Sequence, residues 1–235
     1  RQFIIFLLSF LAWLSSRSIK LSIGTAISFF VIGYFGMWKD TMSTMAIISV
    51  ATLICLILGT PIGVLMARSE RLKNILSPVL DMMQTIPTFV YLIPIIMLLG
   101  IGKVPGLLAV CVYAIPPIVR LTNLGIREVD RRVVEAAKAL GIKKRIILFK
   151  IEIPLALPSI MTGVNQTIMM ALAMVVIASM IGVSGLGVPI LRSISNQFLA
   201  LGLMNGLAIV ALAIIFDRIS QNYARRIQKH KEAKK

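Results

Sequence analysis

The residues best suited to chemistry in this chain lie in one charged segment, positions 127–152. The segment carries eight Lys or Arg residues and four acids, Glu128, Asp130, Glu135 and Glu152. A single charge at the centre of a bilayer costs roughly 2.5–3.5 kcal/mol, so a segment this charged must lie in water. Long apolar runs flank it on both sides and hold it close to a membrane. The segment therefore has the character of a charged, water-exposed loop in a membrane-bound chain.

Within this segment the pattern predicts a short amphipathic helix. Val133, Ala136, Ala137 and Leu140 follow the spacing of one helical face, and Gly141 is a natural stop because glycine adopts the left-handed cap conformation freely. A second short helix is expected over about 143–151, running to Pro154, which either limits it or opens the next span. The small side chains of Ala136 and Ala137 would let another surface approach the backbone. The pattern alone fits an ordinary solvated loop helix equally well.

No catalytic group accompanies this segment. The glycine-rich stretch 182–187 lacks the spacing and the Lys-Ser/Thr pair of a phosphate-binding loop. Cys55 and Cys111 lie inside apolar runs without the spacing of metal ligands, and His230 lies in the charged C-terminal tail. We therefore expect no enzymatic activity, no metal site and no cofactor bound by this chain itself.

Composition and hydropathy indicate an all-α, polytopic membrane helix bundle. The chain has 235 residues, of which 58% are hydrophobic and only 14% charged, and its mean hydropathy is +0.93. A soluble domain is nearer half apolar and a quarter charged. At about 20 residues per span, the apolar runs predict about seven spans, at 3–14, 19–37, 41–66, 78–99, 104–119, 157–181 and 199–216.

The basic residues set an orientation. The net charge of +16 falls in short clusters between apolar runs, which disfavours nucleic-acid binding. Counted over alternate loops, 21 of the 25 Lys and Arg residues lie on the same side as Glu135. By the positive-inside rule that side, with the C-terminus, is cytoplasmic.

Two spans are irregular. Pro78, Pro87 and Pro94 interrupt the fourth, and Pro116 and Pro117 the fifth. Such kinks are tolerated in a membrane against protein or a water-filled cavity, so these spans are expected to face the bundle interior, although kinks for packing alone remain an alternative. The polar residues within or at the ends of spans either mark a pathway or form interhelical hydrogen bonds; the second role is favoured for Asn165, Gln166, Asp81 and Asp217.

The charged segment also carries a family resemblance. Glu135-Ala136-Ala137, then Gly141, then Ile151 and Pro154 at their spacing resemble the signature loop of permease subunits of binding-protein-dependent ABC importers, with Ile153 where Leu is usual. The resemblance implies a coupling helix that docks into a cytoplasmic ATPase, and carries that role to Glu135, Ala136, Ala137, Leu140, Gly141 and Lys143.

Longer stretches, 80–94, 116–127 and 163–187, resemble the glycine betaine and proline betaine subfamily. The resemblance implies a type I ABC importer permease fold in a bacterial cytoplasmic membrane. It also implies a homodimer, two ATPase subunits that bind ATP and Mg, and an extracytoplasmic substrate-binding protein. The expected organisation is N-terminal extra spans at 1–37, a permease core at 38–221 with its coupling loop at 126–154, and a basic cytoplasmic tail at 222–235. Because the chain begins with Arg1, we expect the native N-terminus to be missing.

The substrate remains open between glycine betaine and another small amine or amino acid. A secondary transporter or channel that needs no ATPase is the rival class, but its marks, inverted repeats or buried charged ion sites, are not apparent. For the solute route we predict a weak, transient path lined by some of Phe89, Tyr91, Tyr113 and Asn165.

Overall fold

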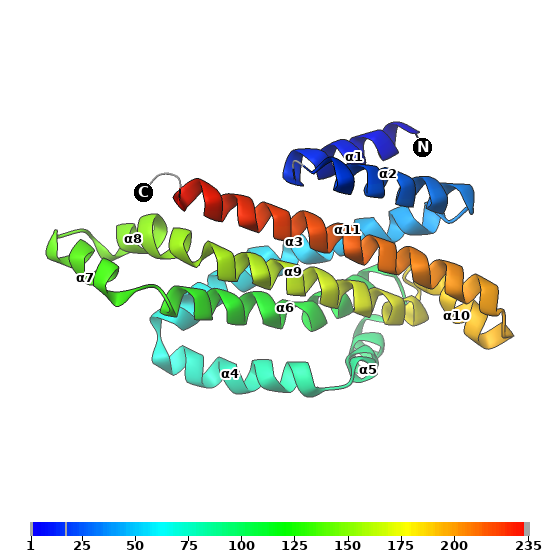
Figure 1. The fold of residues 1–235 in the computed structure, drawn as a ribbon. Helices are drawn as coiled ribbons and strands as arrows, with labels where there is room; N and C mark the ends of the chain where they lie inside the picture. The colour runs from blue at the N-terminus through cyan, green and yellow to red at the C-terminus, as the bar shows by residue number, and fades with distance from the viewer. Residues whose placement is uncertain (1, 17, 233–235) are drawn as a thin grey trace.

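The computed structural model describes residues 2–16 and 18–232, and all regular structure among them is helical. The helices run side by side as an elongated bundle (Figure 1). In chain order they are α1 Gln2–Ser16, α2 Ile19–Tyr34, α3 Trp38–Arg68, α4 Glu70–Thr85, α5 Thr88–Leu99, α6 Lys103–Arg127, α7 Arg131–Ala139, α8 Lys144–Ile147, the π-helix η1 Leu148–Glu152, α9 Ile153–Ala178, the 3₁₀ turn η2 Ser179–Ile181, α10 Gly187–Asn196 and α11 Leu199–Glu232.

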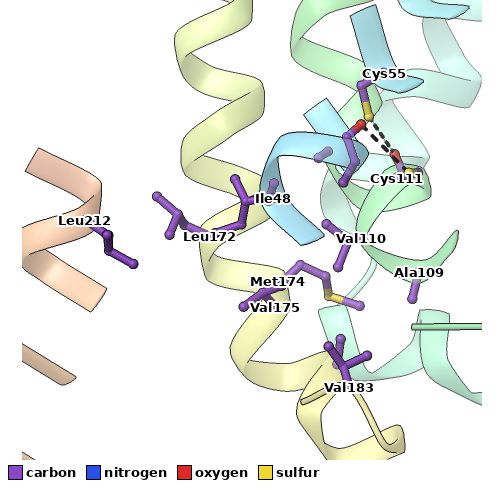
Figure 2. Close-up of a cluster of buried hydrophobic side chains, with 14 of the residues drawn as sticks. Ile48, Cys55, Ala109, Val110, Cys111, Leu172, Met174, Val175, Val183 and Leu212 are labelled. Atoms are coloured by element: carbon purple, nitrogen blue, oxygen red, sulfur yellow. Dashed lines mark hydrogen bonds between the residues drawn. The ribbon is translucent and has the colours of Figure 1, made fainter. Parts of the chain in front are cut away.

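The core lies where α3, α6 and α9 pack against one another, with α11 against α9 (Figure 2). Small residues allow the close approach that membrane helices use in place of a hydrophobic driving force. A Cβ added to Gly63 would lie 2.6 Å from the carbonyl oxygen of Val119, and one added to Gly125 would lie 2.6 Å from Cβ of Ser159. Cys55 and Cys111 face each other in this core as buried free thiols.

The predicted count of seven spans is not confirmed. Among the residues that the structure describes, four helical stretches are long and apolar enough to cross a membrane: Trp38–Arg68, Lys103–Arg127, Lys144–Ile181 and Leu199–Asn222. The fourth predicted span is broken into α4 and α5, which are bent by 101°, because Ile86 and Pro87 are extended there. The helices α1 and α2 are apolar but shorter; they pair with each other and lie against α11.

The sixth predicted span begins earlier than the sequence pattern indicated. We expected a separate short helix over 143–151, but α8, η1 and α9 follow one another without a break and form one stretch, Lys144–Ile181. Of the two roles predicted for Pro154, limiting the short helix or opening the next span, the second is observed, because Pro154 lies in the first turn of α9, where a proline is tolerated. The charged loop is thereby joined rigidly to a core helix.

The glycine-rich stretch closes the end of the bundle opposite α7 (Figure 1). The buried Leu186 N–H donates to Oγ1 of Thr44, at 2.9 Å, and Gly102 N–H donates to the Ile181 carbonyl, also at 2.9 Å. Gly185 has a φ of +151°, and an added Cβ would lie 2.5 Å from Oγ1 of Thr44. These bonds therefore fasten the start of α10 to α3, and η2 to the start of α6.

The side chains of the predicted basic tail, 222–235, lie largely outside the part that the structure describes. The helix α11 extends to Glu232, but the basic side chains beyond position 222 lie outside the part that the structure describes.

Candidate functional site

The helix α7 protrudes at one end of the bundle, beyond the ends of α6 and α9 (Figure 1). Asp130 caps its start by accepting a hydrogen bond from Arg132 N–H, at 2.9 Å. At its end, Gly141 N–H donates to Lys138 O at 2.9 Å and Ile142 N–H donates to Ala137 O at 3.2 Å. With Gly141 at a φ of +72°, this pair of bonds is a Schellman motif. The predicted helix and its stop at Gly141 are confirmed.

The faces of α7 differ from the simple apolar stripe that the spacing predicted. Ala137 is buried, at 5% exposure, whereas Leu140 is 79% exposed. Val133 and Ala136 are exposed as well, and so are the residues Glu135, Gly141 and Lys143. Ala137 thus packs α7 against its own chain. The other predicted docking residues are exposed, and Glu135 among them also lines a cavity between α7 and the bundle.

A polar cavity of about 300 Å³ lies behind α7. Charged residues of both signs line it together with three apolar neighbours: Arg127, Arg131, Glu135, Lys138, Glu152, Ile126, Val129 and Val134. The cavity separates α7 from the base of α6 and from η1, so α7 meets the bundle across a polar gap and not through a packed apolar core.

Glu152, at the end of η1, is the buried acid of this region. Its carboxylate Oε2 lies 2.5 Å from an Nη atom of Arg68, the last residue of α3, and its side chain is only 9% exposed. A buried carboxylate is stable only when paired and hydrogen-bonded, so this ion pair fixes the start of α9 to the end of α3. Sequence reasoning counted both residues as loop charges and assigned neither of them a role.

Arg127, at the end of α6, makes a second junction. Its guanidinium donates to Asn123 Oδ1 at 2.9 Å and to the Met66 carbonyl at 2.8 Å, and it forms an ion pair with Glu70. Glu70 is the first residue of α4 and is exposed. The neighbouring Arg127 lowers the pKa of its carboxyl group. The ends of α3, α4 and α6 are thus tied together beside α7.

The four residues predicted to line a solute route do not form one cluster. Tyr91 of α5 and Tyr113 of α6 meet edge to face, with ring centroids 6.0 Å apart, and the Tyr91 hydroxyl donates to the Met83 carbonyl. Phe89 is 55% exposed. Asn165 lies at a different interface, where its Nδ2 donates to Asp217 of α11 at 2.7 Å. Asn165 and Asp217 thus form an interhelical hydrogen bond with each other, which is the kind of role favoured for each of them from the sequence.

Comparison with known proteins identifies the family to which this chain belongs. Residues 59–229 match the family described as "binding-protein-dependent transport system inner membrane component". This chain belongs to that family. It is a multi-pass inner-membrane protein of the kind its apolar helices indicate.

Named members of the family are close in sequence. The permease protein ProW of the Salmonella typhimurium glycine betaine/proline betaine transport system is 49% identical over 221 residues, which is 94% of this chain and 62% of ProW. The Bacillus subtilis glycine betaine permease protein OpuAB is 42% identical, over 89% of this chain and 74% of OpuAB. The Listeria monocytogenes glycine betaine/carnitine permease protein GbuB is 42% identical, over 95% and 80%. This chain spans 62% of the length of ProW.

The fold is that of type I ABC importer permeases. A chain of the MetNI methionine ABC transporter in an inward-facing conformation superimposes with a TM-score of 0.73 at 20% identity, over 80% of this chain and 94% of that one. A chain of an amino acid ABC transporter superimposes with a TM-score of 0.69 at 20% identity, over 84% and 98%. The predicted fold class is confirmed.

Proposed function

We propose that this chain is the transmembrane permease subunit of an ATP-driven importer for glycine betaine or a related quaternary amine. The observation that carries the proposal is α7, a helix capped at both ends that presents Ala136 and Leu140 to solvent. An exposed apolar patch of this kind is typical of a surface that another protein covers. The names of the relatives that are 42–49% identical support the solute class.

The partners follow from the same proposal. A separate ATPase subunit binds ATP and Mg and docks on α7 through Glu135, Ala136, Leu140, Gly141 and Lys143. Two permease chains associate around the solute route, with two ATPases on the cytoplasmic side and a substrate-binding protein outside. The α7 end and the C-terminus face the cytoplasm, which the 21 basic residues on that side support. Residues 38–221 form the permease core, and 1–37 are additional spans.

The arrangement suggests how motion would be transmitted. Closure of the ATPases on ATP draws the two α7 helices together. The continuous stretch Lys144–Ile181 carries this displacement into the core, and the Arg68–Glu152 pair passes it on to α3. The route then opens outward, and hydrolysis resets it.

Solute binding along the route is weak in this proposal. A quaternary ammonium is attracted to an aromatic face by roughly 0.5–2 kcal/mol, and a conduit must release its solute as well as admit it. The edge-to-face pair of Tyr91 and Tyr113 supplies a modest contact of this kind, with Phe89 exposed on the same helix as Tyr91. Asn165 contributes only if its bond to Asp217 opens.

The experiment is co-purification of the chain with its ATPase and measurement of ATP hydrolysis with the loaded binding protein. We expect stimulation by binding protein carrying glycine betaine, carnitine or trimethylamine N-oxide, and none by binding protein offered an amino acid. A chain that does not bind the ATPase, or that takes up solute without it, would remove the proposal in favour of a secondary transporter.

A further inference from the structure

The helix α4 is divided lengthwise into a polar half and an apolar half. Plotted at about 100° per residue, its polar side chains fall on one half: Glu70, Arg71, Lys73, Asn74, Ser77, Asp81, Gln84 and Thr85. Its apolar side chains fall on the other: Leu72, Ile75, Leu76, Val79, Leu80, Met82 and Met83. This is the pattern of a helix at a boundary between water and an apolar phase.

The position of α4 makes this pattern informative. The helix runs alongside α6 within the length of the bundle (Figure 1), and Leu80 packs with Met66 and Val119 in a small core of its own. On the polar half, Asp81, Gln84 and Thr85 are exposed. Lipid tails cannot satisfy such groups, so the polar half of α4 faces protein or water.

An ion pair lies at the middle of the polar half. Arg120 of α6 bonds to Asp81, although both remain accessible, at 37% and 61% side-chain exposure. Arg120 lies seven residues before the end of α6, about 10 Å along its axis from Arg127. Within the part of the chain that the structure describes, the buried Nε atom of Arg120 has no hydrogen-bond partner, so Asp81 leaves part of the guanidinium unsatisfied.

The same face of α6 carries Tyr113, one member of the aromatic pair. Tyr113 precedes Arg120 by seven residues, which is two turns, so both side chains project from one side of the helix. Tyr113 meets Tyr91 and Arg120 meets Asp81. An aromatic contact, a cation and an anion therefore follow one another where α6 faces α4 and α5.

We propose that Arg120 and Asp81 form a subsite for a zwitterionic solute. When empty, the two residues pair with each other. When a zwitterion arrives, Arg120 donates to its carboxylate and Asp81 faces its ammonium group, so that one ion pair becomes two and no charge is left unpaired. The pair thereby selects solutes that carry both charges and closes again behind them. This inference rests on the proposed function, because it assumes that solute passes along this face.

The test uses the permease assembled with its ATPase and binding protein in proteoliposomes. A Thr85→Cys variant places a thiol on the polar half beside Asp81, and Val79→Cys places one on the apolar half. Cys55 and Cys111 are buried, so the wild-type protein supplies the background. We expect a water-soluble thiol reagent to label Thr85→Cys, glycine betaine with ATP to slow that labelling, and Val79→Cys to be unaffected by the solute. Labelling of Thr85→Cys that glycine betaine does not slow, as expected if a protein partner covers α4, would overturn the proposal.

Charge variants provide the second measurement. Arg120→Gln and Asp81→Asn should each lower glycine betaine uptake about tenfold, the effect of losing one charge-assisted contact. The double neutral variant loses both contacts and should lower uptake further. The exchanged pair Asp81→Arg with Arg120→Asp should recover uptake, because a zwitterion can bind in either sense. Wild-type uptake by the double neutral variant would contradict the subsite. No uptake by the wild-type complex would contradict the proposed function instead.

Discussion

Arg68 and Glu152, which are 84 positions apart in the sequence, meet at 2.5 Å where α3 ends and α9 begins. The pair joins the two core helices at the base of the loop that carries α7. In the proposed mechanism it is a positioning contact, through which a displacement of α7 reaches α3 as well as α9.

Removing one partner of this pair should destabilise the protein and weaken coupling. In Arg68→Ala the buried Glu152 carboxylate loses its cation, and because Arg68 is partly exposed we expect a cost of about 2–3 kcal/mol. Thermal unfolding in detergent and solute-stimulated ATP hydrolysis would measure the two effects. The control is Arg132→Ala, whose pair with Asp130 is 92% exposed on the Arg132 side and should matter little. Equal behaviour of the two variants would deny Arg68 this role.

Gly141→Val should uncouple the ATPase while the chain still inserts into the membrane. At a φ of +72° a β-branched residue is strained by about 1–2 kcal/mol, and the Schellman motif that ends α7 is lost. Gly36→Val is the matched control, because Gly36 has a φ of +75° with nothing near an added Cβ. We expect solute-stimulated ATP hydrolysis to disappear only in the Gly141 variant. Loss in both would point to a general folding defect.

Leu140→Asp should prevent ATPase binding without loss of stability. The side chain is 79% exposed, so its own chain loses little contact, whereas an apolar docking surface would gain an unpaired charge. Ala137→Glu should behave differently: Ala137 is buried against its own chain, so that variant should lower the unfolding temperature as well. Co-purification and thermal unfolding separate the two outcomes. A Leu140→Asp protein that still retains the ATPase would exclude this residue from the interface.

Thr44→Val should loosen the end of the bundle opposite α7. The substitution leaves the buried Leu186 N–H without its acceptor, which costs about 1–3 kcal/mol. Ser43→Ala is the control, because the half-buried Ser43 side chain bonds to the Lys39 carbonyl within its own helix. The free energy of unfolding in denaturant should fall for the first variant and stay unchanged for the second.

The sequence predicted what depends on local pattern. The spacing of Val133, Ala136 and Leu140 predicted α7, and Gly141 predicted its end, because caps and helix periodicity are properties of neighbouring residues. The long apolar runs predicted a helical membrane bundle for the same reason. The assignment of Ala137 to the outward surface was not supported, because which face of a short helix turns inward depends on distant contacts.

What the sequence could not predict depends on residues far apart in the chain. Nothing local pairs Arg68 with Glu152, and nothing local separates Asn165 from Tyr91. The break between α4 and α5 was signalled by Pro87, but its 101° bend is set by packing. The polar half of α4 was readable, since its polar residues recur at helical spacing from Arg71 to Thr85. The prediction of a single apolar span at positions 78–99 does not take this polar half into account.

The most direct measurement is ATP-driven uptake of glycine betaine into proteoliposomes that contain this chain, with the substrate-binding protein outside and the ATPase subunit either present or omitted. We expect uptake only when the ATPase, ATP and the binding protein are all present, and we expect it to be lost in the Leu140→Asp variant. Uptake at the same rate without the ATPase would contradict the claim that this chain couples solute movement to a separate motor.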